Sequence, residues 1–159
     1  MNDKAKLIVN SSLGVELSDS EIDILSNAMH ERGLGDGEFL FEDGTSDDSL
    51  HVILAGKVEV VKRTGDDSFA SLAVLREGEL AGELSFIDGA PHTVGLRALC
   101  ETRVLSLTRD SFEEMIDSNP RLVYKVMRAV ARSAHRIMHR MNTEFVELSN
   151  YIFKQHGRY

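Results

Sequence analysis

The spacing of apolar residues along the chain changes twice. Residues 18–32 carry apolar side chains at helical intervals, and Ser18 precedes Glu21 by three positions, as in a capping box. Residues 37–108 instead alternate apolar and polar positions, in short segments separated by glycines. The pattern predicts a short helix, ended by the glycines of residues 33–38, and then a core of many short antiparallel strands.

The strand pattern is clearest beside Gly56. One parity is occupied by Leu50, Val52, Leu54, Val58 and Val60, and the other parity includes His51, Lys57 and Glu59. Because successive side chains of a strand point to opposite faces, we expect the apolar parity to face the core and His51 to face the polar side.

Helical spacing returns toward the C-terminus. Residues 109–120 predict a short helix with Asp110 or Ser111 as its cap and Pro120 beyond its end, and residues 121–153 predict a long helix without glycine or proline. The apolar stripe of this long helix consists of Val126, Val130, Ala134, Ile137, Met141, Phe145, Leu148 and Ile152. A helix of that length is roughly 45 Å long or longer, so part of the stripe extends beyond what one domain of this size covers. We therefore expect a homodimer held by the long helix.

Together these periods predict a mainly β fold with flanking α-helices. The architecture is an antiparallel β-roll or jelly roll, that is, a double-stranded β-helix, followed by a long C-terminal helix. The organisation expected is an N-terminal extension over residues 1–17, the β-roll with its flanking helices over residues 18–120, and the long helix and tail over residues 121–159.

The composition is that of a globular protein, because 42% of the 159 residues are hydrophobic and 28% are charged. No apolar run approaches the roughly 18 residues that a membrane-spanning helix needs, and the N-terminus lacks the apolar core of a signal peptide. With Cys100 as its single cysteine, the chain cannot form an internal disulfide. These features exclude a transmembrane protein and a disulfide-stapled scaffold, and they predict a cytoplasmic location.

Charge is distributed unevenly along the chain. Residues 1–120 contain 10 Lys and Arg against 24 Asp and Glu, a net −14, whereas residues 121–159 contain 8 against 2, a net +6. The basic side chains follow one side of the long helix, as Arg121, Lys125, Arg128, Arg132, Arg136 and Arg140. We expect them to pair with the acidic body. A DNA-reading helix is the alternative, but no helix-turn-helix follows it, and no direct DNA binding is predicted.

Residues 78–98, which read GELAGELSFIDGAPHTVGLRA, resemble the phosphate-binding cassette of cyclic nucleotide-binding domains. Upstream, residues 37–61 are similar to the opening strands of this family, and downstream residues 98–136 are similar to its closing strand and two C-terminal helices. Such domains occur in catabolite activator proteins and in the regulatory subunits of cyclic-AMP-dependent protein kinase. The resemblance covers about residues 18–140 and implies the β-roll fold.

The resemblance also implies a ligand site. Gly82 would let the backbone approach a cyclic phosphate, Glu83 would accept a hydrogen bond from the ribose 2′-hydroxyl, and Thr93 would bring a hydroxyl near the phosphate. The full set of ligand-binding residues predicted is Gly82, Glu83, Leu84, Ser85, His92, Thr93 and Val94, with Leu84 and Ser85 as backbone donors. Without the resemblance, Gly82 is a turn residue and Glu83 a surface carboxylate.

One residue departs from the family pattern. Members that bind nucleotide generally have an arginine where this chain has His92, within the run Pro91-His92-Thr93-Val94. A lost charge-assisted hydrogen bond costs roughly 1.5–3 kcal/mol, or about 10- to 150-fold in affinity. Arg97 is not expected to substitute, because it lies five positions further along a strand and projects from the opposite face. Two interpretations stay open: a pocket that binds a cyclic nucleotide weakly, or a degenerate pocket in which His92 is a surface residue.

The function predicted is that of a non-catalytic sensor, in which cAMP or cGMP under the cassette repositions the long helix and alters a partner that the sequence does not identify. Ser133, Asn142 and Thr143 are candidates to reach the ligand from that helix. The main alternative is an interaction scaffold that binds no nucleotide, and a fragment of a transcription regulator is a more remote one.

No catalytic residue, metal ligand or cofactor is predicted. His135 and His139 are spaced to face one side of the long helix, but no third metal ligand lies nearby in sequence. Neither a nucleophile–base arrangement nor a phosphate-binding loop or dinucleotide motif occurs.

Overall fold

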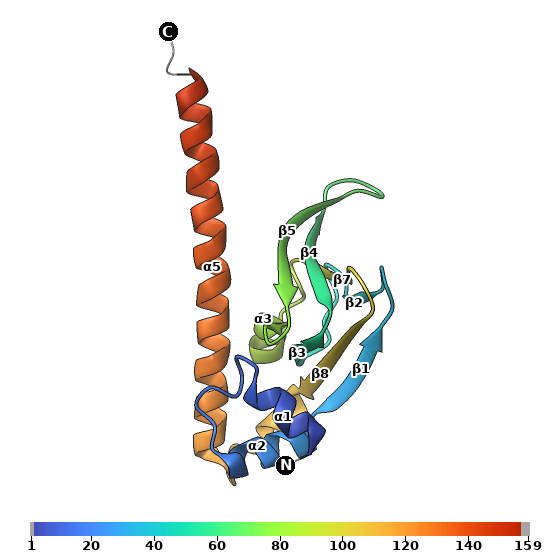
Figure 1. Ribbon diagram of the computed structural model, residues 1–159, viewed down its shortest axis with the longest axis vertical. Helices are drawn as coiled ribbons and strands as arrows, with labels where there is room; N and C mark the ends of the chain where they lie inside the picture. The colour runs from blue at the N-terminus through green and yellow to red at the C-terminus, as the bar shows by residue number, and fades with distance from the viewer. Residues whose placement is uncertain (1, 157–159) are drawn as a thin grey trace.

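The computed structural model describes residues 2–156, which form a β-roll with helices packed against it and one long helix beside it (Figure 1). Its elements in chain order are α1 (Asp3–Val9), α2 (Asp19–Ala28), β1 (His30–Leu34), β2 (Phe39–Phe41), β3 (Ser49–Ala55), β4 (Lys57–Arg63), β5 (Phe69–Arg76), β6 (Leu80–Ala81), α3 (Glu83–Asp88), β7 (Gly95–Ala98), β8 (Thr102–Thr108), α4 (Arg109–Glu113) and α5 (Pro120–His156). The predicted fold class, an antiparallel β-roll with a long C-terminal helix, is confirmed.

The strands form two antiparallel sheets of four strands each. One sheet has the order β1-β8-β3-β6 and the other has the order β2-β7-β4-β5. Apart from the β4–β5 hairpin, each strand lies in the opposite sheet from the strand before it. This alternation closes the two sheets into a roll, with α3 inserted between β6 and β7 on the side that faces α5 (Figure 1).

Two apolar clusters hold the molecule together. The first lies between the sheet β1-β8-β3-β6 and the helices, and it includes Leu50, Phe86 and Leu105. The second lies between the two sheets and includes Ile53. Since Leu50 and Ile53 have opposite parity on β3, this strand is buried on both faces. His51, expected on a polar side, is therefore only 3% exposed.

The residues before β1 pack as part of the domain. Ala5 and Ile8 of α1, together with Leu13 after it, are buried in the first cluster. The capping box predicted for α2 is present, because the side chain of Ser18 accepts from the Glu21 N–H while the carboxylate of Glu21 accepts from the Ser18 N–H. The predicted N-terminal extension thus contributes to the core through its described residues, 2–17.

The helix α2 ends at Ala28, earlier than the sequence pattern indicated. Residues 30–34 form the strand β1, which pairs antiparallel with β8 along its whole length. They are neither the end of this helix nor the start of the glycine-containing segment that was predicted to end it. Pairing with a strand about 70 positions away overrides the local helical spacing, because β propensity depends on the neighbouring strand.

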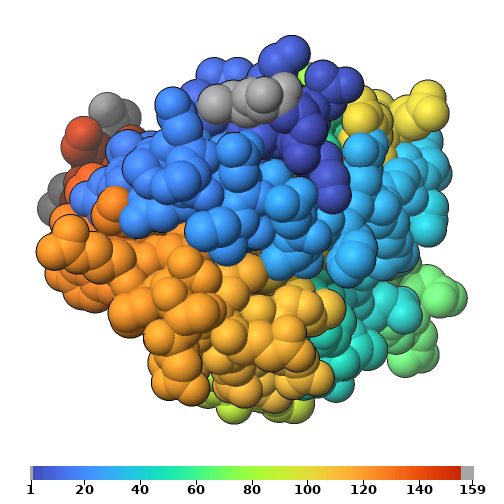
Figure 2. Space-filling model, turned by 90° about the horizontal axis from the view of Figure 1, so that it is seen from below, coloured from blue at the N-terminus to red at the C-terminus, as the bar shows by residue number. Residues whose placement is uncertain are grey.

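The helix α4 begins after Thr108, whose side chain accepts a hydrogen bond from the Ser111 N–H. The cap is therefore Thr108 and not the predicted Asp110 or Ser111. The helix α5 begins at Pro120, a residue favoured at the first helical position because its missing N–H has no partner there. Figure 2 shows this end of the molecule, where residues 109–125 in orange lie against α2 in blue.

The helix α5 has two unlike halves. Its first half packs on the body, and Val126 and Val130 are at most 1% exposed. Its second half projects beyond the β-roll (Figure 1), and Phe145 is 70% exposed. The apolar stripe predicted from the sequence is thus buried at one end and exposed at the other. None of the helices in residues 2–156 combines the length and apolar character that a membrane span requires.

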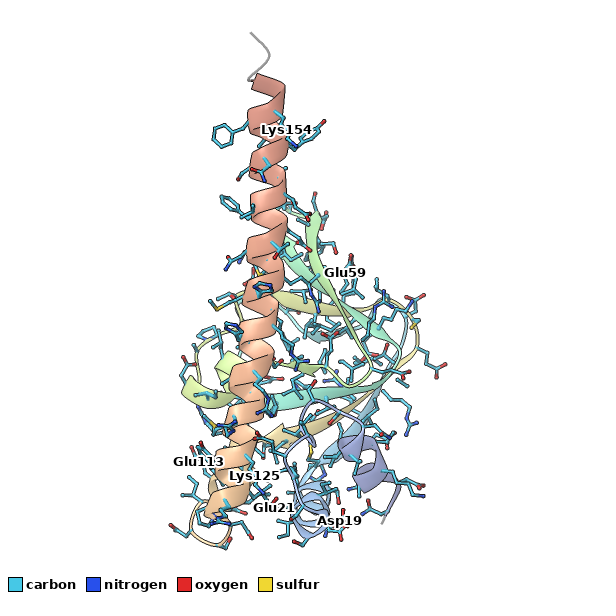
Figure 3. The ribbon with its side chains drawn as sticks, turned by 60° about the vertical axis from the view of Figure 1, so that its left-hand side comes forward. Asp19, Glu21, Glu59, Glu113, Lys125 and Lys154 are labelled. Atoms are coloured by element: carbon cyan, nitrogen blue, oxygen red, sulfur yellow. The ribbon has the colours of Figure 1, made fainter. Side chains whose placement is uncertain are left out.

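The basic side of α5 lies against acidic residues of the body, as the charge pattern predicted. The ion pairs are Lys125–Glu21, Arg128–Glu16, Arg132–Glu16 and Arg140–Glu79, with shortest N···O distances of 2.8, 2.9, 3.3 and 3.2 Å. Figure 3 shows Lys125 and Glu21 near the lower end of α5, far from Lys154 on the projecting half. Most of the basic row is therefore engaged by the chain's own carboxylates.

Candidate functional site

The cassette residues fold around the start of α3. Gly82 precedes this helix in the left-handed conformation, with φ 81°, a backbone geometry that favours glycine. A Cβ at this position would lie 2.7 Å from the carbonyl oxygen of Ser49. Only glycine therefore lets β6 turn directly into α3, and this turn brings Glu83 into the interior.

A pocket of about 160 Å³ opens between α3 and residues 90–94. It is lined by Phe41, Gly82, Glu83, Leu84, Ser85, Asp88, Ala90, Pro91, His92, Thr93 and Val94. The structure thus brings all seven residues of the predicted ligand site to one pocket. Known ligand pockets typically measure roughly 300–1,000 Å³, so this pocket is smaller than one that encloses a ligand of nucleotide size.

Glu83 lies at the end of the pocket that faces α5. Glu83 is 9% exposed, and its Oε1 accepts a hydrogen bond of 2.7 Å from the hydroxyl of Ser133. Burial raises the pKa of Glu83, although the hydrogen bonds from its own backbone N–H and from Ser133 favour the charged form. Glu83 is therefore a buried acceptor, and the surface position that its residue type alone suggested is wrong.

His92 lines the same pocket. Its ring stacks on Phe41 with 3.5 Å between ring centroids and 9° between the planes. Its Nε2 lies 2.8 Å from Oδ1 of Asp47, and its side chain is 5% exposed. His92 is thus buried and committed to a carboxylate of this chain, so the interpretation of His92 as a surface residue is wrong.

Asp47 joins His92 to a second buried histidine. Its Oδ2 lies 2.6 Å from Nε2 of His51, whose Nδ1 lies 2.7 Å from the hydroxyl of Ser106. Partial burial by itself would raise the pKa of Asp47, but the hydrogen bonds and charges of His51 and His92 lower it to about 2. Asp47 is therefore a carboxylate at any pH near neutrality, held between two imidazoles.

Backbone pairing fixes the segment that carries His92. The His92 N–H donates to the carbonyl of Thr45 and its carbonyl accepts from the Gly44 N–H, both at 2.7 Å. Nearby, the ammonium of Lys62 donates to the carbonyl of Thr93 at 2.7 Å and to Asp43 at 3.0 Å. Residues 43–47 and the cassette therefore form one rigid unit, which holds the imidazole of His92 in place.

Three residues of this site were not found from the sequence. Asp47 lies in a polar loop, His51 has the parity assigned to the outer face, and Phe41 lies in a strand 51 positions before His92. No spacing along the chain joins them. A histidine inside an otherwise continuous apolar run, as in residues 50–54, was the one available signal of a buried polar contact.

The remaining predicted residues are placed as follows. Ser133 reaches the pocket, whereas Asn142 and Thr143 are exposed on the projecting half of α5. Arg97 is bonded to Glu59 at 3.1 Å and does not line the pocket, as its strand position indicated. Among residues 2–156, no three His, Cys, Asp or Glu side chains are grouped closely enough to hold a metal ion.

A larger groove of about 650 Å³ lies between Ser12 and the first half of α5. Arg136 donates to Ser12 and Nη1 of Arg132 pairs with Glu16, whereas Nη2 of Arg132 is buried without a hydrogen-bond partner among the described residues. We place the candidate site at the smaller pocket, because buried hydrogen-bonding groups from several elements converge there.

Comparison with known proteins points to the same segment. The family description "cyclic nucleotide-binding domain" matches residues 31–119. A CRP-like cAMP-activated global transcriptional regulator from Mycobacterium tuberculosis is 30% identical over 100 residues, which are 63% of this chain and 45% of that protein. The chain thus spans less than half the length of this relative.

Solved structures share the fold. A cyclic nucleotide-binding domain from Methylobacillus flagellatus superposes with a TM-score of 0.82 at 23% identity, covering 90% of this chain and 83% of the other. The regulatory subunit of a cAMP-independent protein kinase A from Trypanosoma cruzi, bound to guanosine, superposes with a TM-score of 0.70 at 21% identity, covering 90% of this chain and 50% of the other.

Proposed function

The chain belongs to the cyclic nucleotide-binding domain family, and from this premise we propose that it is a regulatory, non-catalytic domain. Its ligand site is the cassette pocket, its ligand is a cyclic nucleotide, cAMP or cGMP, and α5 carries the response in the cytoplasm. The observation that carries this proposal is the hydrogen bond of 2.7 Å between Glu83 and Ser133. It links the candidate ligand site directly to the long helix.

This link gives a ligand a way to act on α5. A sugar hydroxyl that reaches Glu83 donates to the carboxylate that already accepts from Ser133. A ligand shifts an equilibrium only as far as its affinity for two states differs. Because the Ser133 contact competes with the ligand for one buried carboxylate, binding favours an arrangement in which α5 lies further from the pocket.

Binding is expected to be weak. His92 stands in the place of an arginine that offers a permanent charge and a planar pair of donors. The loss of one charge-assisted hydrogen bond corresponds to roughly 1.5–3 kcal/mol, or about 10- to 150-fold in affinity. The pocket of about 160 Å³ adds a second cost, because it must widen to admit the ligand.

The experiment that tests this function is calorimetry with cAMP and cGMP, supported by thermal shift. A ligand at 100 times its dissociation constant stabilises the fold by about 2.7 kcal/mol. The Glu83→Ala variant is expected to lose the shift, whereas Asp36→Asn, which changes an exposed carboxylate outside the pocket lining, is the matched control and keeps it. No shift with either nucleotide at millimolar concentration contradicts ligand binding.

The response is proposed to pass to a second copy of the chain. Met141, Phe145 and Leu148 on the projecting half of α5 are 46%, 70% and 58% exposed. A homodimer that packs this half against its counterpart removes these side chains from water. Ile137→Glu combined with Met141→Glu should give monomers in light scattering, whereas Asn142→Glu should not. A monomeric unmodified protein at micromolar concentration contradicts the dimer.

A second candidate function is that of an interaction scaffold which binds no nucleotide. The observation that favours it is that polar side chains of the pocket already have hydrogen-bond partners within the chain, since Glu83 is bonded to Ser133 and His92 to Asp47. The same calorimetric screen separates the two candidates, because a scaffold shows no ligand-dependent shift.

A further inference from the structure

The groove between the α1–α2 loop and α5 carries an excess of positive charge. Glu16 pairs with two arginines of α5, since its Oε2 lies 2.9 Å from Nε of Arg128 and 3.3 Å from Nη1 of Arg132. Arg136, one turn further along, donates to the hydroxyl of Ser12 at 3.1 Å and has no ion pair within the described residues. Three guanidinium groups on successive turns of α5 are thus opposed by one ion-paired carboxylate in the described part of the chain.

One donor of this cluster is left without an acceptor. Nη2 of Arg132 is buried and makes no hydrogen bond within residues 2–156. Glu16 does not supply one, because Nε and Nη2 of Arg128 already donate to its two oxygens at 2.9 and 3.1 Å. A buried donor without an acceptor is unfavourable, since the loss of its hydration is not compensated. The Arg132 side chain as a whole is 37% exposed, so a rotation of this long side chain can present Nη2 to the groove.

Both walls of the groove are fixed to the body. On the loop side, the Ser12 N–H donates to the carbonyl of Gly78 at 2.9 Å, and Leu13 is buried in the first apolar cluster. On the other side, Val130 and Ser133 of α5 are buried as well. Figure 1 shows this loop beside the first half of α5. The groove of about 650 Å³ is therefore formed without a ligand, and its volume lies within the roughly 300–1,000 Å³ of known ligand sites.

The residues that line the groove indicate the chemistry of a ligand. They combine donors with apolar side chains, as Ser12, Val15, Ala131, Arg132, His135 and Arg136. Guanidinium groups bind phosphate through pairs of hydrogen bonds, and a hydroxyl and an imidazole can donate to further oxygens. A phosphate monoester has three terminal oxygens and a charge of about −1.5 to −2 near neutral pH, whereas a carboxylate has two oxygens and one charge. Val15, which is 71% exposed, offers contact to an apolar group on the phosphate.

We propose that this groove is a second ligand site, which binds a small organic phosphate monoester. The phosphate lies against Arg132 and Arg136 and supplies the acceptor that Nη2 of Arg132 lacks, and the organic group covers Val15. A ligand in this place joins the α1–α2 loop to α5 and holds the first half of the helix on the body. The groove and the cassette pocket share no lining residue, so this inference is independent of the ligand proposed for the cassette.

Calorimetry with phenyl phosphate, inorganic phosphate and phenol tests the inference at low ionic strength. Phenyl phosphate should bind about tenfold more tightly than inorganic phosphate, because its ring leaves water, and phenol should not bind measurably. Arg132→Gln and Arg136→Gln should each weaken the binding of phenyl phosphate about tenfold or more, which is the effect of one charge-assisted hydrogen bond. Arg136→Lys, which keeps the charge and loses the planar pair of donors, should weaken it less. Arg121→Gln is the matched control, because it removes the same charge from an exposed arginine of α5 outside the groove lining, and it should bind normally.

Four results would overturn the inference. These are no binding of phenyl phosphate at millimolar concentration, binding that survives Arg132→Gln and Arg136→Gln, equal weakening by Arg121→Gln, and phenol binding as tight as that of phenyl phosphate. The second result would place the ligand elsewhere, and the third would mean that the basic row attracts anions without a specific site. Arg136 is exposed, so Arg136→Gln should keep the Tm of the unmodified protein and decides the matter if Arg132→Gln does not fold. Binding of cAMP or cGMP bears on the proposed function alone.

Discussion

Two carboxylates lie at the cassette pocket, and the fold shifts their pKa values in opposite directions. Partial burial would raise the pKa of Asp47, but His51 and His92 lower it to about 2. Burial raises the pKa of Glu83, and one hydroxyl from Ser133 does not reverse this. A carboxylate whose charge is stabilised by its neighbours contributes to folding, whereas one whose charge is penalised costs stability. The comparison indicates that the charge of Asp47 supports the structure, whereas the charge of Glu83 costs stability.

Removing the carboxylate of Asp47 should give the largest effect. Asp47→Ala leaves the Nε2 donors of two buried histidines without an acceptor, and we expect a loss of about 3 kcal/mol in the free energy of unfolding. Urea denaturation at pH 7 measures it. Asp47→Asn, which keeps one acceptor, should lose less, and a loss below about 1 kcal/mol in Asp47→Ala would mean that the cluster contributes little to stability.

Acid should lower the free energy of unfolding through the protonation of Asp47. The folded pKa of Asp47 lies below its ordinary value of 3.8, so its contribution is present above pH 4 and is lost as the pH falls toward 2. Because Asp47 is partly exposed, solvent screening reduces the contribution of this shift to on the order of 1 kcal/mol. Denaturation at a series of pH values, compared with Asp47→Asn, checks this. Parallel pH profiles in the two proteins would contradict the prediction.

For Glu83 we expect the opposite dependence of stability on pH. Its folded pKa is raised, so its unfavourable charge is absent at low pH and develops as the pH rises through the folded pKa. Glu83→Gln should therefore stabilise the fold at pH 8, on the order of 1 kcal/mol, and have little effect at pH 3. It should also weaken ligand binding in calorimetry. A destabilised Glu83→Gln protein that binds normally would remove the functional role assigned to Glu83.

The smallest effect concerns binding of the cyclic nucleotide. Nε2 of His92 is bonded to Asp47, whereas an arginine at this position offers several donors. His92→Arg should therefore strengthen the binding of cAMP, on the order of fivefold, in calorimetry. An unchanged affinity in His92→Arg would contradict this role of residue 92.

The local sequence pattern correctly predicted the features that depend on residues within a single helix or segment. The capping box of Ser18 and Glu21, the uninterrupted long helix and the β-rich segment were all readable, since each depends on residues a few positions apart. The cassette also depends on neighbouring residues, because Gly82 directly precedes the helix Glu83–Asp88. The strand over residues 30–34 was missed, because its pairing partner lies far along the chain.

The sequence by itself determined the β-roll and the acid-paired side of α5, because periodicity and charge are properties of the chain. The resemblance of residues 78–98 to a phosphate-binding cassette predicted where the pocket lies. Only the tertiary structure decided what those residues contact. It joined His92 to Asp47, His51 to Ser106 and Ser133 to Glu83. These hydrogen bonds span 45, 55 and 50 positions of the chain. Burial and partners depend on which strands and helices become neighbours, and these properties set the charge of each group and hence the ligand that the pocket can accept.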